Sequence, residues 1–301
     1  MSKNPYIALH TSVFLFGFTP ILGKLLSLNA YSLVWWRMCI ASLIFLVFPK
    51  FFEQLKSLNR KQLILFIGIG FLVALHWITF YGSIKVANSA SLTLACFGLT
   101  ATFTSFLEPF INRQKVILSD IVLGLLAFGG ILFIFLSSAH TSIPAEKFSI
   151  ALGLGIFSSS IAAFFSSLNA KFIKSAQPVP VTFVELSSGF MFLSLFFMLI
   201  SPASFEWLNN ESDFIWMLLL TIFCTNIAFA LNLQAMKKIS AFIANITINL
   251  EPVYGILWAV IIFSENRMLN SHFYLGAVVI LFTVLLHSFL KRKKLFSKQL
   301  E

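Results

Sequence analysis

The polar residues that could do chemistry lie inside long apolar runs, and the densest group is in the stretch NITINLEPVYGILW, residues 245–258. This stretch holds Asn245, Asn249, Glu251 and Pro252. An ionised carboxylate in apolar surroundings is unfavourable, so Glu251 must be protonated or firmly partnered. A carboxyl group that alternates between these states could bind and release a proton, which makes Glu251 the candidate for proton coupling. A permanently neutral Glu251, hydrogen-bonded to a neighbouring helix, is the alternative.

Helical geometry divides this stretch into two faces. Steps of 100° per residue place Asn245, Asn249 and Pro252 on one face, and Glu251 and Tyr254 on the nearly opposite face. Pro252 has no backbone N–H, which leaves a carbonyl free one turn earlier and predicts a hinge in mid-helix. We expect one face to contact helices and the other to line a cavity, where the asparagines either bind a ligand or join helices.

A second group lies in ALHWITFYG, residues 74–82, with His76, Trp77 and Tyr81. A neutral imidazole could donate to a ligand or share a proton path, although a lone histidine is more often a packing residue. Trp77, Tyr81 and Tyr254 could form the aromatic walls of a small-molecule site. No second histidine or cysteine stands at ligand spacing, so the sequence predicts no metal and no cofactor.

Two further polar residues lie inside other apolar runs. Arg37 follows Trp35 and Trp36, where its guanidinium could clamp a carboxylate or extend outward to an interface marked by the tryptophans. Asn226 lies near the centre of its run. Both are candidates for substrate contact.

The elements that must position these residues are membrane-spanning helices. Of the 301 residues, 58% are hydrophobic and 11% are charged, too apolar a composition for a soluble protein. A crossing helix needs about 20 apolar residues. Ten such runs occur, at 6–26, 30–49, 63–83, 88–110, 117–137, 148–170, 180–200, 213–233, 240–263 and 271–290.

The positive charges indicate how the runs are oriented. When the connectors are assigned alternately to two sides, 16 of the 21 lysines and arginines fall on the side of both termini, including the KRKK tail. Positive charge accumulates on the cytoplasmic side, so we expect a multi-pass protein of the cell (inner) membrane with both termini cytoplasmic. The net charge of +10 therefore reflects topology, and no nucleic-acid partner is expected.

The ten runs divide into two sets of five. Residues 1–137 and 148–290 form two repeats, joined by a linker at 138–147 and followed by a basic tail at 291–301. A shift of 152 positions aligns Lys85 with Lys237 and Gly124 with Gly276. Since five is odd, the second copy must enter from the opposite side. The predicted fold is an all-α integral membrane protein with ten transmembrane helices in two inverted five-helix repeats, an arrangement that places substrate sites near the midplane.

The stretch EPVYGILWAVIIFSENRMLNSHFYLGAVVIL, residues 251–281, resembles the signature of the EamA-type branch of the drug/metabolite transporter superfamily. Pro252, Glu265 and Gly276 fall on its characteristic positions, and WWRMCIASLIF is similar to the second span of its first half. The resemblance implies a metabolite carrier that rocks two halves around a central cavity. It also implies a structural or gating ion pair for Arg37 and a scaffold role for Glu265. The first repeat departs from the pattern, with Arg113 and Thr100 opposite Glu265 and Pro252.

These observations favour a secondary active transporter and not an enzyme. The expected substrate is a small neutral, zwitterionic or amphipathic metabolite, with an amino acid or related compound favoured, moved by alternating access in the direction of export. Its partners would be that substrate, the lipid bilayer and, as a hypothesis, protons. The alternatives are a nucleotide-sugar or phosphosugar exchanger, a membrane-embedded lipid-modifying enzyme and a channel. Monomer and dimer both remain open.

Overall fold

The structure is a computed structural model that describes residues 4–47, 51–112, 118–136, 141–200, 202–239, 247–248 and 250–297. Every regular element in these ranges is a helix, as predicted, and none of the ranges contains a strand. The first half comprises α1 Pro5–Gly17, α2 Thr19–Leu25, α3 Ala30–Leu46, α4 Phe51–Leu55, α5 Arg60–Ala87, α6 Ala90–Phe97, α7 Thr100–Asn112 and α8 Leu118–Leu136. The second comprises α9 Ala145–Phe172, η2 Ile173–Ser175, α10 Pro178–Leu199, η3 Pro202–Ser204, α11 Glu211–Thr221, the π-helical η4 Ile222–Ile227, α12 Ala228–Met236, α14 Glu251–Phe263, η5 Glu265–Arg267 and α15 Ser271–Ser297.

Six helical stretches are long and apolar enough to cross a membrane: Pro5–Leu25, Arg60–Ala87, Ala90–Asn112, Ala145–Ser175, Pro178–Leu199 and Glu211–Met236. The other four predicted runs fall on shorter apolar helices, Ala30–Leu46, Val122–Leu136, Glu251–Phe263 and Ser271–Thr283. Large apolar side chains such as Phe71, Phe110 and Phe289 are exposed on the outside of the bundle. This is the surface that hydrocarbon surroundings require.

Side-chain caps set where several helices begin. Asn29 and Asn59 accept backbone N–H groups at the starts of α3 and α5, and Asn59 forms a reciprocal capping box with Gln62. Ser89 does the same for α6. Such caps satisfy backbone donors that have no partner inside the helix.

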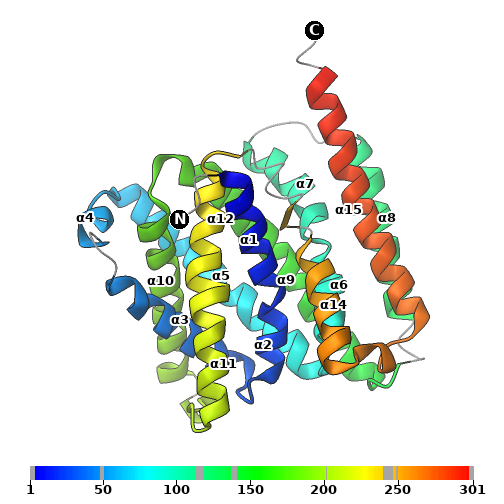
Figure 1. The fold of residues 1–301 in the computed structure, drawn as a ribbon, viewed down its shortest axis with the longest axis horizontal. Helices are drawn as coiled ribbons and strands as arrows, with labels where there is room; N and C mark the ends of the chain where they lie inside the picture. The colour runs from blue at the N-terminus through cyan, green and yellow to red at the C-terminus, as the bar shows by residue number, and fades with distance from the viewer. Residues whose placement is uncertain are drawn as a thin grey trace.

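The helix contacts between the two halves come in equivalent pairs, in which each half contributes the corresponding helices. Helix α1 packs against α12 of the other half, and α5 packs in the same way against α9. The pairs α3–α10, α6–α14 and α8–α15 each join corresponding helices, and Figure 1 shows α8 and α15 side by side along one flank. At that flank a Cβ on Gly276 would lie 2.8 Å from the Gly130 carbonyl oxygen, so two glycines allow the close approach. The chain therefore has a two-repeat architecture.

Several spans are interrupted at one level of the bundle. The first span changes from α1 to α2 at Phe18, and the fourth changes from α6 to α7 at Gly98–Leu99. The eighth contains the π-helical segment η4, and α14 begins at Glu251 after a turn at Leu250. Pro252 was predicted in mid-helix, but it lies in the first turn of α14, where a missing N–H removes no helical bond. Its hinge role stays a prediction.

Candidate functional site

The interruptions surround a cavity of about 70 Å³ between the two halves, which we call the central cavity. The first half contributes Phe16, Thr19, Arg37, His76, Trp77, Phe80, Phe97 and Thr100, and the second half contributes Ala162, Phe165, Ser166, Phe229, Asn232, Ile248 and Glu251. The predicted residues Arg37, His76, Trp77 and Glu251 therefore meet in one place. The volume is well below the range of about 300–1,000 Å³ typical of small-molecule sites, so the cavity must widen to hold a ligand of that size.

Arg37 is the central polar group of this site and is only 1% exposed. Its Nη1 donates to the Tyr81 hydroxyl at 2.6 Å, and its Nε donates to the Thr225 hydroxyl at 2.7 Å. Its Nη2 donates to the Cys224 carbonyl at 3.1 Å, and the guanidinium carbon lies 3.7 Å from the centre of the Trp77 ring. These contacts fix the guanidinium plane and use three of its five N–H groups.

In the described part of the chain no carboxylate lies within ion-pair distance of Arg37, so the structural or gating ion pair that the resemblance implies stays a prediction. Arg37 also does not extend outward to the interface. Glu185 is fully buried elsewhere and accepts a long hydrogen bond of 3.4 Å from Asn169. Arg37 therefore brings a positive charge to the cavity wall that Glu251 also lines, with no carboxylate at ion-pair distance among the described residues.

The π-helical segment η4 explains how Arg37 is held. Its wider turn leaves the Cys224 carbonyl available to Arg37, while the Thr225 hydroxyl donates to Leu220, five residues earlier. Single π-helical turns are frequent at functional sites. We did not predict this segment, because no local residue pattern distinguishes it from an ordinary helical turn.

His76 is buried and packs against Phe97, with ring centres 5.6 Å apart. Its Nδ1 lies 2.7 Å from the Ser158 hydroxyl of α9, and that hydroxyl also donates to the His76 carbonyl at 3.1 Å. The imidazole therefore joins α5 to α9 and reaches the cavity with the rest of its ring.

Glu251 is 7% exposed and lines the central cavity, but its two asparagine neighbours Asn245 and Asn249 lie outside the described residues. Three other polar atoms on the cavity wall are buried without a hydrogen-bond partner in the described ranges, the hydroxyls of Thr19 and Thr100 and the Asn232 side-chain oxygen. Buried polar atoms normally have partners, so these three atoms point to a polar ligand or water in the cavity. The sequence analysis did not select any of these residues.

Other predicted site residues do not reach the cavity. Asn226 donates from its side chain to the Ala41 carbonyl at 2.9 Å, which joins η4 to α3. Tyr81 lies behind Arg37 and supports it. Tyr254 packs against Phe14 with ring centres 5.8 Å apart. None of these three residues is among the described residues that line the cavity, and each makes a packing or supporting contact instead.

A second polar cluster, which we call the Glu265 clamp, joins the halves at the end of α14. The fully buried Glu265 carboxylate accepts from Lys24 Nζ at 2.7 Å and from the Ser89 hydroxyl, the Ala90 N–H and the Ser91 N–H, each at 2.9 Å. The carboxylate thus caps the N-terminus of α6, a favourable place for negative charge. The resemblance implied only a scaffold role for Glu265, and its contact with Lys24 was not predicted.

The electrostatics of the clamp favour the ionised form. Burial raises the pKa of the Glu265 carboxyl, but hydrogen bonds from Lys24, Ala90 and Ser91 outweigh burial, and the pKa lies below its ordinary value. The counterpart contact in the other half is much simpler. Lys171, at the end of α9, donates to the Ile111 carbonyl at the end of α7 at 2.8 Å on an exposed surface. Among the described residues, the Glu265 clamp is therefore the larger of these two polar contacts between the halves.

The family comparison agrees with this two-repeat arrangement. The model of the EamA-like transporter family matches the chain twice, over residues 4–136 and 149–289. The chain belongs to the EamA-like transporter family. This EamA-like chain is thus a multi-pass membrane transporter, with one family unit on each side of the central cavity.

Comparison with solved structures shows the same fold. A structure titled "Crystal structure of protein" superposes on this EamA-like chain with a TM-score of 0.66 over 97% of this chain and 99% of the other, at 14% identity. No curated protein matches the chain.

Proposed function

We propose that the chain is a secondary transporter that exports a small zwitterionic metabolite, with amino acids and related compounds favoured, across the cell membrane. The observation that carries this proposal is the Arg37 guanidinium on the wall of the central cavity, with no carboxylate at ion-pair distance in the described ranges. Its two remaining N–H groups can bind a substrate carboxylate. Glu251 on the same cavity wall can accept from a substrate ammonium group.

The proposed fold has ten spans in two inverted repeats, with both termini in the cytoplasm. The repeated helix pairings support the symmetry, and the excess of lysine and arginine on the side of the termini supports the orientation. Alternating access then requires the halves to move apart first on one side of the cavity and then on the other. The Glu265 clamp lies on the side opposite the termini in this orientation.

The cavity argues against large polyanionic substrates. Arg37 is the one cation among the described residues that line it, and a nucleotide sugar would need more positive charge and more room. Proton coupling through Glu251 is part of the proposal. Transport by Glu251→Gln should continue without dependence on a pH gradient, and full retention of that dependence would refute the coupling.

A counterflow assay in proteoliposomes tests the substrate class. Vesicles are loaded with a neutral amino acid, with the corresponding amine that lacks the carboxylate, or with the corresponding acid that lacks the ammonium group. Labelled amino acid should accumulate only when the unlabelled amino acid is inside. Equal counterflow with the amine would contradict the role of Arg37, and equal counterflow with the acid would contradict the role of Glu251. No counterflow with a panel of such amino acids would refute the substrate class.

A further inference from the structure

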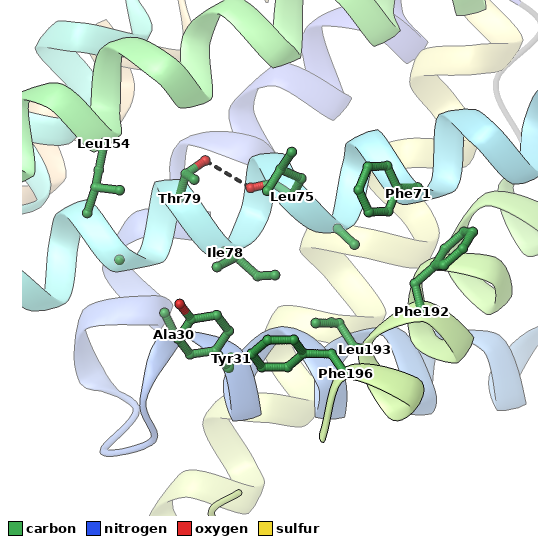
Figure 2. Close-up of a pocket in the computed structure, with 12 residues that line it drawn as sticks. Ala30, Tyr31, Phe71, Leu75, Ile78, Thr79, Leu154, Phe192, Leu193 and Phe196 are labelled. Carbon is green, nitrogen blue, oxygen red and sulfur yellow. Dashed lines mark hydrogen bonds between the residues drawn. The ribbon is translucent and has the colours of Figure 1, made fainter. Parts of the chain in front are cut away.

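Two apolar grooves lie on the side of the bundle, away from the central cavity. The Tyr31 groove, of about 330 Å³, is formed by α3, α5, α9 and α10, and Figure 2 shows Tyr31, Ile78 and Phe196 around it. The Leu58 groove, of about 400 Å³, lies between the α4–α5 connection and α10, with Leu58, Leu63 and Leu195 among its walls. Both grooves have almost entirely apolar linings, which excludes them as sites for a polar substrate.

The two grooves are neighbours along α5 and α10. Phe192 lines both of them, and its ring packs edge-on against Phe71 with centres 5.2 Å apart. Phe71, Phe192 and Met191 are exposed, so the grooves open sideways. Along α10 the Leu58 groove extends from Phe183 to Leu195, which corresponds to about 18 Å of helix, slightly more than half of a hydrocarbon core of about 30 Å.

Charge distinguishes the Leu58 groove from the Tyr31 groove. Lys56, Arg60 and Lys61 are exposed beside the residues that form its end. Gln62 donates to the Ser175 carbonyl at 3.1 Å, which brings the exposed Lys174 to the same rim. One carboxylate, Glu53, lies exposed in the same segment and only partly offsets four cations. Near the Tyr31 groove, segments 28–31 and 202–210 hold Glu206 and no lysine or arginine. Lys85, three residues after Gly82, is half-buried and donates to the Leu26 carbonyl.

We propose that the Leu58 groove binds an anionic phospholipid from the leaflet on the side of the chain termini. One acyl chain lies along α10 in the groove, and the phosphate and headgroup contact Lys56, Arg60 and Lys61. An apolar slot that ends at a cationic rim matches the two chemical parts of such a lipid. Basic residues placed only to orient the chain would have no need of an adjoining groove. This proposal does not depend on what the transporter carries.

Native mass spectrometry of the purified protein with an equimolar mixture of phosphatidylglycerol and phosphatidylcholine, both with palmitoyl and oleoyl chains, tests the proposal. The wild type should retain the anionic lipid at least about fivefold over the neutral one, the factor expected for a single basic contact near a membrane surface. The variant Lys56→Gln/Arg60→Gln/Lys61→Gln should reduce this ratio to near one. The matched control Lys291→Gln/Arg292→Gln/Lys293→Gln removes the same charge from the tail and should keep the ratio.

A second pair of variants tests the groove itself. Ser187→Phe places a ring in the Leu58 groove and should remove the retained lipid, because Ser187 lines that groove. Gly82→Leu fills the Tyr31 groove, where a Cβ would meet only Leu154 at 3.5 Å, and should leave binding unchanged. Thermal unfolding of each variant shows that it is folded. Equal retention of both lipids by the wild type, equal loss in the tail control, or binding that survives Ser187→Phe would each overturn the proposal.

Discussion

The Glu265 clamp gives the sharpest test of how the two halves are held together. In the variant Glu265→Gln, an amide NH₂ group replaces one carboxylate oxygen. That oxygen accepts two of the four hydrogen bonds, and the incoming NH₂ group faces donors that it cannot satisfy. Lys24, whose side chain is 10% exposed, loses its charged partner at the same time.

The expected loss follows from these contacts. Breaking a buried ion pair by removing one partner destabilises a protein by about 3–5 kcal/mol. For a chain of 301 residues, 1 kcal/mol shifts the melting temperature by roughly 1.6 °C, so Glu265→Gln should lower the melting temperature by about 5–8 °C. The double variant Lys24→Met/Glu265→Gln should lose less than the sum of the two single variants, because it leaves no unpaired charge.

Thermal unfolding in detergent at one fixed scan rate measures these differences. Arg267→Gln is the matched control, since Arg267 is exposed two residues from Glu265 and should change stability by less than about 0.5 kcal/mol. A melting temperature of Glu265→Gln within about 1 °C of the wild type would refute the clamp. Strict additivity of the two single variants would show that Lys24 and Glu265 do not stabilise the protein as a pair.

Three further predictions concern pH, the cavity and the helix contact between repeats. The pKa of Glu265 lies below its ordinary value in the folded state, so its contribution is present above the unfolded value of about 4.3 and is lost as the pH falls through the lower folded value. The melting-temperature gap between wild type and Glu265→Gln should therefore stay constant from pH 7 to 5 and narrow below about pH 4, and a gap that widens in acid would contradict this sign. Arg37→Lys keeps the charge but not the planar fork, so counterflow should slow at least about tenfold, whereas an unchanged rate would remove Arg37 from the site. Gly276→Val should lower the melting temperature by several degrees, because the new valine side chain would meet the Gly130 carbonyl. The control Gly129→Ala should leave the melting temperature unchanged, because a Cβ there has nothing within 4 Å. Equal melting temperatures for the two variants would disprove the close contact.

Much of the fold was predictable from hydropathy, because a helix that spans hydrocarbon consists of a long run of apolar residues. Each of the ten runs overlaps a helical stretch in the described part of the chain, and six of these stretches meet the length and composition of a spanning helix. The positions at which helices are interrupted were not predicted. The sequence does hold signals for two of them, because Pro20 lies in the first turn of α2 after Phe18, and Gly98 is the C-cap of α6 before Leu99.

The candidate site was predicted only in part, for a physical reason. Arg37, His76, Trp77 and Glu251 stand out because polar or amphipathic groups inside apolar runs need partners, and all four line the cavity. Their partners could not be identified, since a threonine or a serine in a helix can bond to its own backbone. Thr225 and Ser158 gain their roles only from the helices that face them.

Residues of the first half bond to and pack against residues of the second half, which has a consequence for biosynthesis. Thr225 is made 188 residues after Arg37, which corresponds to about 10–40 s of translation at 5–20 residues per second. Throughout this interval the guanidinium lacks the segment that will hold it, and α5 lacks its partner α9 until Phe172 has been made. We therefore expect the nascent first half to stay within the insertion machinery, or against chaperones, until the second half is made. When the two halves are made as separate chains, the first should be degraded unless the second is supplied in the same cell.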